Sequence, residues 1–247
     1  MKLRYILLLG LAAWAYYTFS MERVPKKQKV EGQVTQKSIA DILKTAPEVI
    51  QKRYKISGDQ IVLDLSALGI TSLEGLEMVP HYTQITNLSL VGNYLTSIPN
   101  DAFYGMKNLQ KLDLFFNEIR TIEPLAFKGL SMLQELDLSD NKLKQVGVFL
   151  ANLDNLRVLN LENNNISSIA PNAFRDLKNA VDVSLENNTL KTINLDSLIY
   201  KVEGTTRADG LVKLEVLNLE GNQLSDEDQE RITQHIHRYT PHTTIIF

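Results

Sequence analysis

Apolar residues recur along the middle of the chain in a fixed pattern. The segment 109–130 reads LQKLDLFFNEIRTIEPLAFKGL and follows the spacing L-x-x-L-x-L-x-x-N-x-L. The alternation that buries Leu112 and Leu114 but not the residue between them is typical of a short strand with one buried face. Asn117 closes this part of the pattern, which begins again at Leu133. The segment is therefore one unit of an internal repeat.

The repeat returns at a nearly constant interval. Five of the steps between successive units are 23 to 25 residues long, and the last step is 34 residues. Each unit contributes two apolar residues separated by one position, which predicts one strand per unit in a single parallel sheet. The units open at Gln60, Ile85, Leu109, Leu133, Leu156, Ala180 and Leu214.

Two other columns repeat with the strands. An asparagine follows the second strand leucine by three residues in every unit except the first, where Leu68 takes its place. Because an amide side chain both donates and accepts, stacked asparagines are expected to satisfy the backbone of neighbouring turns. Phenylalanines at 103, 127, 149 and 174 predict an aromatic spine inside the repeats. The predicted asparagine ladder consists of Asn93, Asn117, Asn141, Asn164, Asn188 and Asn222.

Together these columns resemble the leucine-rich repeat family, whose units are about 20–29 residues long. The resemblance implies an α/β-type solenoid, a horseshoe with one parallel strand per repeat and helical caps at both ends. It also implies a binding scaffold rather than an enzyme. Animal extracellular members usually have cysteine-rich caps, which this chain lacks because it contains no cysteine. The resemblance therefore points to a bacterial or protist binding module.

The first residues predict export. A basic start at Lys2 and Arg4 precedes an apolar run from Tyr5 to Phe19, which fits a signal peptide, and an uncleaved membrane anchor remains the alternative. We expect a periplasmic, cell-surface or secreted protein that touches a membrane only through this segment. The predicted boundaries are 1–20 for the signal peptide or anchor, 21–37 for a flexible linker, 38–58 for a helical N-terminal cap, 59–224 for the seven repeats and 225–247 for a C-terminal cap.

Helix signals flank the repeats. Ser38 is expected to cap a first helix, and Thr45 a second helical turn in which Pro47 lies near the start. At the other end, Ser225 and Asp228 resemble a capping box with Asp in place of Glu. Both helical segments are predicted to cover an open end of the repeat stack.

The C-terminal part contains three further expectations. A closing helix is predicted over 227–239 with Ile232 and Ile236 facing inward, followed by a last strand within 243–247. The overlong sixth repeat carries an excursion at 195–210, which is expected to be a loop. This loop either makes a contact or is simply tolerated, because loops accept extra length at little cost in free energy.

Composition excludes several kinds of chemistry. The absence of cysteine excludes disulfides, thiolate zinc sites and a cysteine nucleophile. With 29 acidic residues against 26 basic ones, the net charge of -3 gives no reason to expect nucleic acid as a partner. His235, His237 and His242 are expected to be solvated surface residues. No catalytic residue, cofactor or metal site is predicted, and no calcium-loop motif supports the alternative of a calcium site among Asp113, Asp137 and Asp140.

The outward positions of the strands, on the concave face of the expected horseshoe, suggest a binding surface. Nine acidic side chains and a single lysine occupy these positions, and two adjacent phenylalanines interrupt the polar pattern. At least one of these phenylalanines should be exposed or half-exposed, which is typical of a binding anchor with a charged surround. The predicted binding residues are Phe115, Phe116, Asp113, Asp137, Asp140, Glu162, Glu186 and Glu220.

These features favour a non-enzymatic protein-binding scaffold. We expect a monomer whose partner is a protein or peptide, preferably basic. Three alternatives remain from the sequence: a solvated acidic face that only aids solubility, a structural or adhesive envelope protein without a discrete partner, and an enzyme built from dispersed carboxylates.

Overall fold

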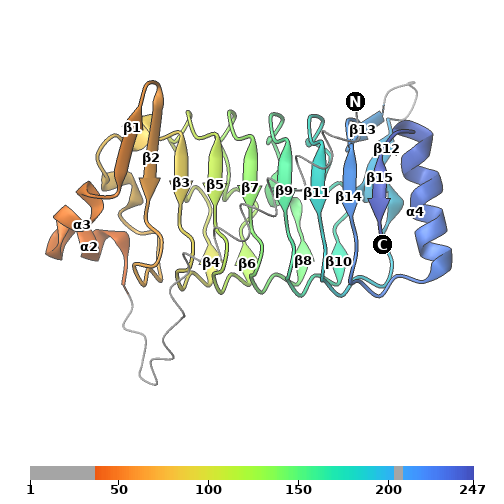
Figure 1. The fold of residues 1–247 in the computed structure, drawn as a ribbon, viewed down its shortest axis with the longest axis horizontal. Coiled ribbons are helices and arrows are strands. Elements are labelled where there is room, and N and C mark those ends of the chain that lie inside the picture. Colours follow the sequence, from red (N-terminus) through yellow and green to blue (C-terminus); the bar gives the residue numbers. More distant parts are fainter. Residues whose placement is uncertain (1–36, 203–207) are drawn as a thin grey trace, which may run out of the picture. The chain divides into compact units, whose positions relative to one another are not determined.

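One sheet of nine strands organises the part of the chain that the computed structural model describes, residues 37–202 and 208–247. All neighbouring strands are parallel except β1 and β2, which form an antiparallel hairpin (Figure 1). The predicted parallel strand in each repeat is therefore confirmed. The order is β1 (Tyr54–Ser57), β2 (Gln60–Asp64), β3 (Asn87–Ser89), β5 (Lys111–Asp113), β7 (Glu135–Asp137), β9 (Val158–Asn160), β11 (Asp182–Ser184), β14 (Val216–Asn218) and β15 (Thr244–Ile246).

The strands pair in the register that the repeat requires. Leu112 lies opposite Leu136, and Leu136 lies opposite Leu159. Each of these side chains is only 1 % exposed, so the leucine columns line up and point into the coils. Phe127 stacks on Phe103 with ring centroids 5.9 Å apart and meets Phe149 edge-on at 6.1 Å. Aligned leucines and stacked rings thus form one continuous core, which no single coil could bury alone.

The other side of each coil is made of turns and very short strands. Here β4 pairs with β6 and β8 pairs with β10, both in parallel (Figure 1). The bounds are β4 (Ser97–Ile98), β6 (Thr121–Ile122), β8 (Gln145–Val146), β10 (Ser168–Ile169), and for the 3₁₀ turns η1 (Leu76–Met78), η2 (Tyr82–Gln84), η3 (Val148–Leu150) and η4 (Leu195–Ser197).

Two short helices precede the sheet, α2 (Ile39–Thr45) and α3 (Pro47–Gln51). Ser38 caps α2 as predicted and forms a reciprocal capping box with Asp41. The prediction that Thr45 caps the second helix is wrong, because Ala46 is the N-cap residue and makes no side-chain bond. The Thr45 hydroxyl instead donates to the carbonyl of Asp41 at 2.7 Å, since this group of the previous helical turn lies within its reach.

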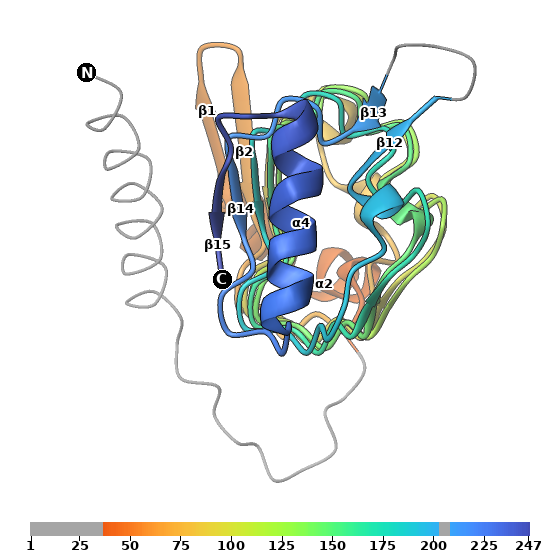
Figure 2. The same ribbon diagram turned by 90° about the vertical axis from the view of Figure 1, so that its right-hand side faces the viewer.

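Helix α4 (Asp226–Tyr239) lies across the other end of the stack, beside the last strand β15 (Figure 2). Ile232 and Ile236 are buried in the core, as predicted. Ser225 accepts a bond from the Asp228 N–H at 3.2 Å, whereas the Asp228 carboxylate accepts from the Ser225 hydroxyl at 2.9 Å. Ser225 and Asp228 therefore form the N-cap of α4, as predicted from the sequence.

The excursion at 195–210 is not simply a loop, which corrects the prediction. Strands β12 (Ile199–Lys201) and β13 (Ala208–Gly210) form an antiparallel pair. Gly210 permits this close approach, because its φ is 101° and an added Cβ would lie 2.3 Å from the Leu198 carbonyl oxygen. His235 Nε2 lies 2.6 Å from the Ile199 carbonyl oxygen, which fastens the pair to α4.

The predicted signal peptide or anchor at 1–20 and the predicted linker at 21–37 lie outside the described residues, apart from Lys37. Within residues 37–202 and 208–247, no helix is both long and apolar enough to cross a membrane.

Candidate interaction surface

The ladder asparagines hold neighbouring coils together. Asn164 is representative: its Oδ1 accepts from the Leu143 N–H at 3.0 Å, and its Nδ2 donates to the carbonyls of Leu138 at 3.0 Å and Leu161 at 3.1 Å. The amide therefore bonds to its own coil and to the preceding one. The same pattern of bonds surrounds Asn93, Asn117, Asn141, Asn188 and Asn222.

The residue before each ladder asparagine has a left-handed backbone. Glycine occupies the position twice and asparagine twice, and both tolerate this conformation. Phe116 has the largest side chain at this position, and its φ is 57°. Its N–H donates to the Ser139 carbonyl of the next coil at 3.2 Å, as the corresponding residues of other coils do. The column consists of Gly92, Phe116, Asp140, Asn163, Asn187 and Gly221, together with Ala67, which precedes Leu68 in the first coil.

The middle outward residue of the strands has a structural role that sequence reasoning missed. In most coils its side-chain oxygen accepts the N–H of the residue two positions later, as in Asx turns. Asp113 binds the Phe115 N–H at 3.0 Å and Asp137 binds the Ser139 N–H at 2.9 Å. The sequence could have indicated this role, because every residue at this position is Asp, Asn or Ser. These residues are Asp64, Ser89, Asp113, Asp137, Asn160, Ser184 and Asn218.

Phe115 and Phe116 lie together on the outer sheet face, the side of the sheet that carries the outward columns. Their ring centroids are 5.8 Å apart and their planes are inclined by 32°. Phe115 is buried, at 6 % exposure, yet it does not belong to the core cluster of leucines. Phe116 is half-exposed, as expected for at least one of the pair. The two rings therefore form an aromatic pair outside the main core.

Four carboxylates lie close together over the later coils and are called the carboxylate cluster: Asp137, Asp140, Glu162 and Glu186. Asn163 links two of them, because its Nδ2 donates to Asp140 Oδ2 at 3.2 Å and to Glu162 Oε1 at 3.1 Å. Asn218 Nδ2 donates to Glu186 Oε2 at 2.7 Å. Within residues 37–202 and 208–247, none of the four carboxylates has a cationic partner.

The proximity of these groups changes their proton affinity. Burial raises the pKa of Glu162 to about 7, with further contributions from the negative charges of Glu186, Asp140 and Asp137. Burial also raises the pKa of Asp137 and of Asp140 above the usual range for aspartate. The cluster is therefore a site where negative charge is crowded and where a cation would be favourable.

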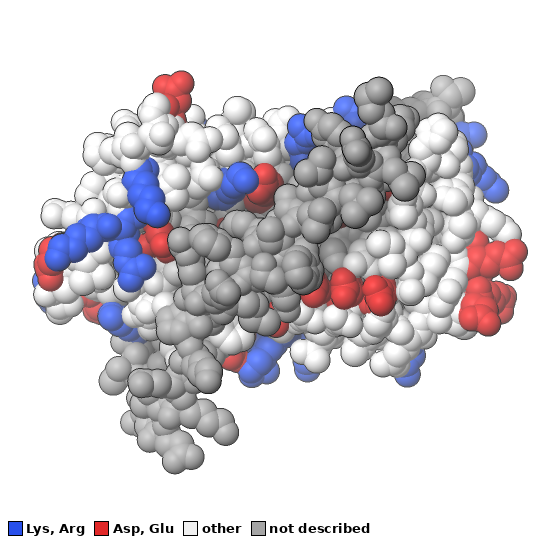
Figure 3. All heavy atoms as spheres, in the orientation of Figure 1, with Lys and Arg blue, Asp and Glu red and all other residues white. Residues whose placement is uncertain are grey.

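The earlier strands carry a different balance of charge. Glu135 Oε2 lies 2.7 Å from Lys111 Nζ, and Asp64 lies 3.9 Å from the Arg53 guanidinium. Figure 3 shows basic atoms gathered over the first coils and a short row of acidic atoms below the later strands. The predicted acidic face is thus partly neutralised at its N-terminal end, and its unpaired acid belongs to the later coils.

The remaining chemical candidates are sparse. In the described part of the chain, no group of His, Asp and Glu side chains is arranged to hold a metal ion, including the three aspartates considered for calcium. The expectation of a solvated histidine is wrong for His235, which is half-buried and whose Nε2 lies 2.6 Å from the Ile199 carbonyl oxygen; His237 is exposed, and its Nε2 lies 3.0 Å from the Thr243 carbonyl oxygen. Both histidines lie on α4, where they contact residues near the end of the stack.

Comparison with known proteins agrees with the geometry. A family model described as "Leucine rich repeat" matches residues 83–143 and 154–224, which cover more than half of the chain. No curated protein matches the chain significantly. Members of this family are generally non-enzymatic scaffolds for protein interaction. The repeat register, the parallel sheet and the family match together show that the chain belongs to the leucine-rich repeat family.

Proposed function

We propose that the outer sheet face binds a basic segment of a protein partner. Half-exposed Phe116 provides the apolar anchor, supported by the ring of buried Phe115, and Asp140, Glu162 and Glu186 provide the charged surround. The observation that carries the proposal is the placement of an aromatic pair on the same sheet face as a carboxylate cluster without cationic partners in the described residues. Aromatic anchors with a polar surround are typical of binding hot spots.

The predicted residues divide into two groups. Asp113 and Asp137 each use one oxygen to hold a backbone N–H, so their main contribution is to the shape of the strand ends. Asp140, Glu162 and Glu186 follow the strands and carry the charge toward a partner. Glu220 extends this acidic row to the last repeat, and its own N–H is held by Asn218 at 3.0 Å.

Electrostatics favours a basic partner over a neutral one. Like charges within a few ångströms repel one another, and a lysine or arginine placed between them removes that repulsion. Exposed charge pairs contribute little individually, about 0.2–1 kcal/mol each. The aromatic pair is therefore needed to supply most of the affinity, while the carboxylates select the sign of the partner.

The proposal includes export. The basic start and the apolar run before residue 20 support a signal peptide or an anchor. Sequencing the N-terminus of the protein from its native source tests this part. A terminus near residue 20 supports cleavage, whereas an intact Met1 in the cytosolic fraction contradicts export.

The binding proposal is tested by capture of partners with the full chain. Changing both phenylalanines, Phe115→Ser and Phe116→Ser, is expected to abolish capture at both low and high salt. Tyr104→Ser is the matched control, because Tyr104 is an aromatic residue that is 63 % exposed and lies outside the strands. Unchanged capture by the double variant contradicts the anchor. Self-association without any other captured protein favours the adhesive alternative.

A further inference from the structure

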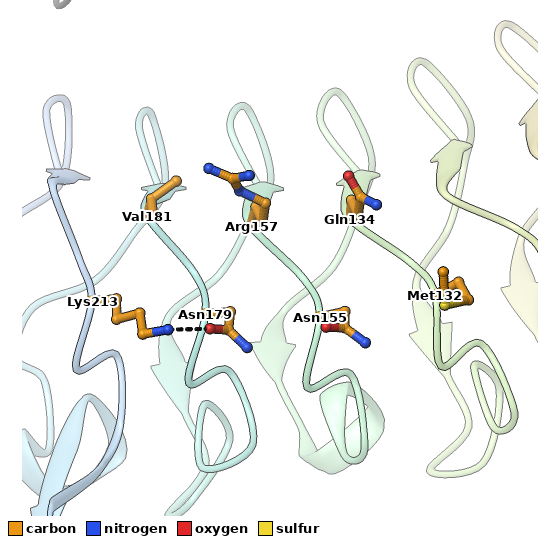
Figure 4. Close-up of a pocket in the computed structure, with 7 residues that line it drawn as sticks. All are labelled: Met132, Gln134, Asn155, Arg157, Asn179, Val181 and Lys213. Carbon is orange, nitrogen blue, oxygen red and sulfur yellow. Dashed lines mark hydrogen bonds between the residues drawn. The ribbon is translucent and has the colours of Figure 1, made fainter.

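A second surface lies at the edge of the sheet, away from the carboxylate cluster. Here a groove of about 480 Å³ runs along several coils. One row of its lining comes from residues that directly precede strands β7, β9 and β11, namely Gln134, Arg157 and Val181. The other row consists of Met132, Asn155, Asn179 and Lys213 (Figure 4). We call this feature the edge groove.

The second row is held in place by hydrogen bonds between coils. Asn155 Nδ2 donates to the Ser131 carbonyl at 2.7 Å, and Asn179 Nδ2 donates to the Asp154 carbonyl at 2.7 Å. Each asparagine thus donates from Nδ2 to the preceding coil, and its Oδ1 can accept another hydrogen bond. Asn179 Oδ1 accepts from Lys213 Nζ at 2.5 Å, which holds the lysine in the groove (Figure 4).

The groove offers cationic and amide groups that are not used within the described protein. Arg157 has no ion pair and no side-chain hydrogen bond with any residue in 37–202 and 208–247, and the same is true of the Gln134 amide. Lys213 has an amide partner but no carboxylate in that part of the chain. Nearby Lys178, by contrast, lies 3.5 Å from Asp154.

We propose that the edge groove binds an extended acidic peptide segment. An arginine guanidinium binds a carboxylate through two parallel hydrogen bonds, and Lys213 supplies a second positive charge. Arg157 and Lys213 stand in different rows of the groove (Figure 4) and belong to coils two steps apart, which corresponds to about 10 Å along the sheet at the spacing of neighbouring strands. An extended peptide covers this distance in about three residues, so two acidic side chains can reach both cations.

The amides favour a peptide over a free small anion. Gln134 can donate to a peptide carbonyl, and Asn155 Oδ1 can accept a peptide N–H. Met132, which is 45 % exposed, and Val181 give apolar contact for side-chain methylenes. The sign of this site is opposite to that of the carboxylate cluster, so the two surfaces select partners of opposite charge.

The test is a titration of the full chain with fluorescein-labelled hexaglutamate, followed by fluorescence anisotropy at low salt. Hexaglutamine is the matched probe without charge. We expect Arg157→Gln and Lys213→Gln each to weaken hexaglutamate binding about threefold, and the double variant to weaken it about tenfold. Lys144→Gln is the matched control, because Lys144 is an exposed lysine outside the groove, and it should bind like the wild type.

A further variant separates specific recognition from net charge. Arg157→Lys keeps the charge but removes the two-pronged geometry, so it should bind less tightly than the wild type. Equal binding of hexaglutamate and hexaglutamine overturns the proposal. So does equal weakening by the groove variants and by Lys144→Gln, since both results mean that the groove does not recognise the acidic chain.

Discussion

The rings of Phe115 and Phe116 lie 5.8 Å apart, although the backbone of Phe116 has a left-handed φ of 57°. A bulky residue in this region is strained, by about 1–3 kcal/mol. The inter-coil bond from the Phe116 N–H to Ser139 and the neighbouring ladder asparagine Asn117 maintain the conformation. The repeat imposes this backbone conformation, because the corresponding residue of every other coil is also left-handed.

The strain at Phe116 can be measured by comparing two substitutions. Both Phe116→Ala and Phe116→Asn remove the ring, but asparagine tolerates the left-handed region and alanine does not. We therefore expect Phe116→Asn to be about 1 kcal/mol more stable than Phe116→Ala in chemical denaturation, while both lose partner binding. Equal stability of the two variants would mean that the backbone stores no strain there.

Stability should depend on pH through Glu162. The pKa of this carboxyl is raised from 4.5 to about 7 in the folded protein, first by burial and then by neighbouring negative charges. Between these two values the folded state binds more protons than the unfolded state, so the free energy of unfolding falls as pH rises. We expect the wild type to lose stability between pH 5 and pH 8 at low salt.

The pH experiment has a matched pair of variants. Glu162→Gln keeps the acceptor for Asn163 but cannot ionise, so it should flatten part of the decline in stability between pH 5 and pH 8. Glu123→Gln changes an exposed glutamate outside the cluster and should leave the decline unchanged. If both variants follow the wild-type slope in urea denaturation, repulsion at the cluster does not affect folding.

The asparagine ladder predicts that alanine substitution at two adjacent asparagines lowers stability by very different amounts. Asn164→Ala leaves the Leu143 N–H and the carbonyls of Leu138 and Leu161 without the bonds that Asn164 made. The expected loss is about 2–4 kcal/mol, because these backbone groups are buried. Asn165 is exposed, and Asn165→Ala should change stability by less than about 0.5 kcal/mol. Similar losses for both variants in thermal unfolding would exclude the ladder as a main source of stability.

Alanine substitution at two glycines with a left-handed backbone distinguishes the cost of backbone strain from the cost of steric contact with a neighbouring residue. Gly92 and Gly221 have φ of 67° and 71°, but an added Cβ meets nothing within 4 Å at Gly92 and lies 2.2 Å from Asn187 Oδ1 at Gly221. Gly92→Ala should lower the free energy of unfolding by about 1 kcal/mol, and Gly221→Ala should lower it further, because the Asn187 side chain must also move away from the new Cβ. A larger loss at Gly92 would contradict the packing described here.

The sequence allowed prediction of the features that repeat. The leucine columns that align Leu112 with Leu136, and the asparagine that follows them, recur at constant spacing, and period and register follow from that spacing alone. The aromatic pair was also found, since Phe115 and Phe116 interrupt an otherwise polar column. Binding by these residues stays a prediction.

Features that depend on contacts between distant parts of the chain were missed. The His235 ring forms a hydrogen bond with the Ile199 carbonyl, 36 residues away, and no local sequence pattern indicates this contact. The hydrogen bonds that Asn155 and Asn179 form between coils at the edge groove were also missed. Met132 occupies the same repeat position as these asparagines, so the sequence shows no unbroken column there.

The most direct test of the binding surface is the affinity of the full chain for a labelled hexa-arginine peptide. The variant with Asp140→Asn, Glu162→Gln and Glu186→Gln should lose affinity at least tenfold, because it removes the carboxylates that select a basic partner. A control with three neutralised exposed acids elsewhere, Asp59→Asn, Glu74→Gln and Glu123→Gln, has the same net charge and should lose less than about twofold. Equal losses in the two variants would contradict a specific acidic binding face.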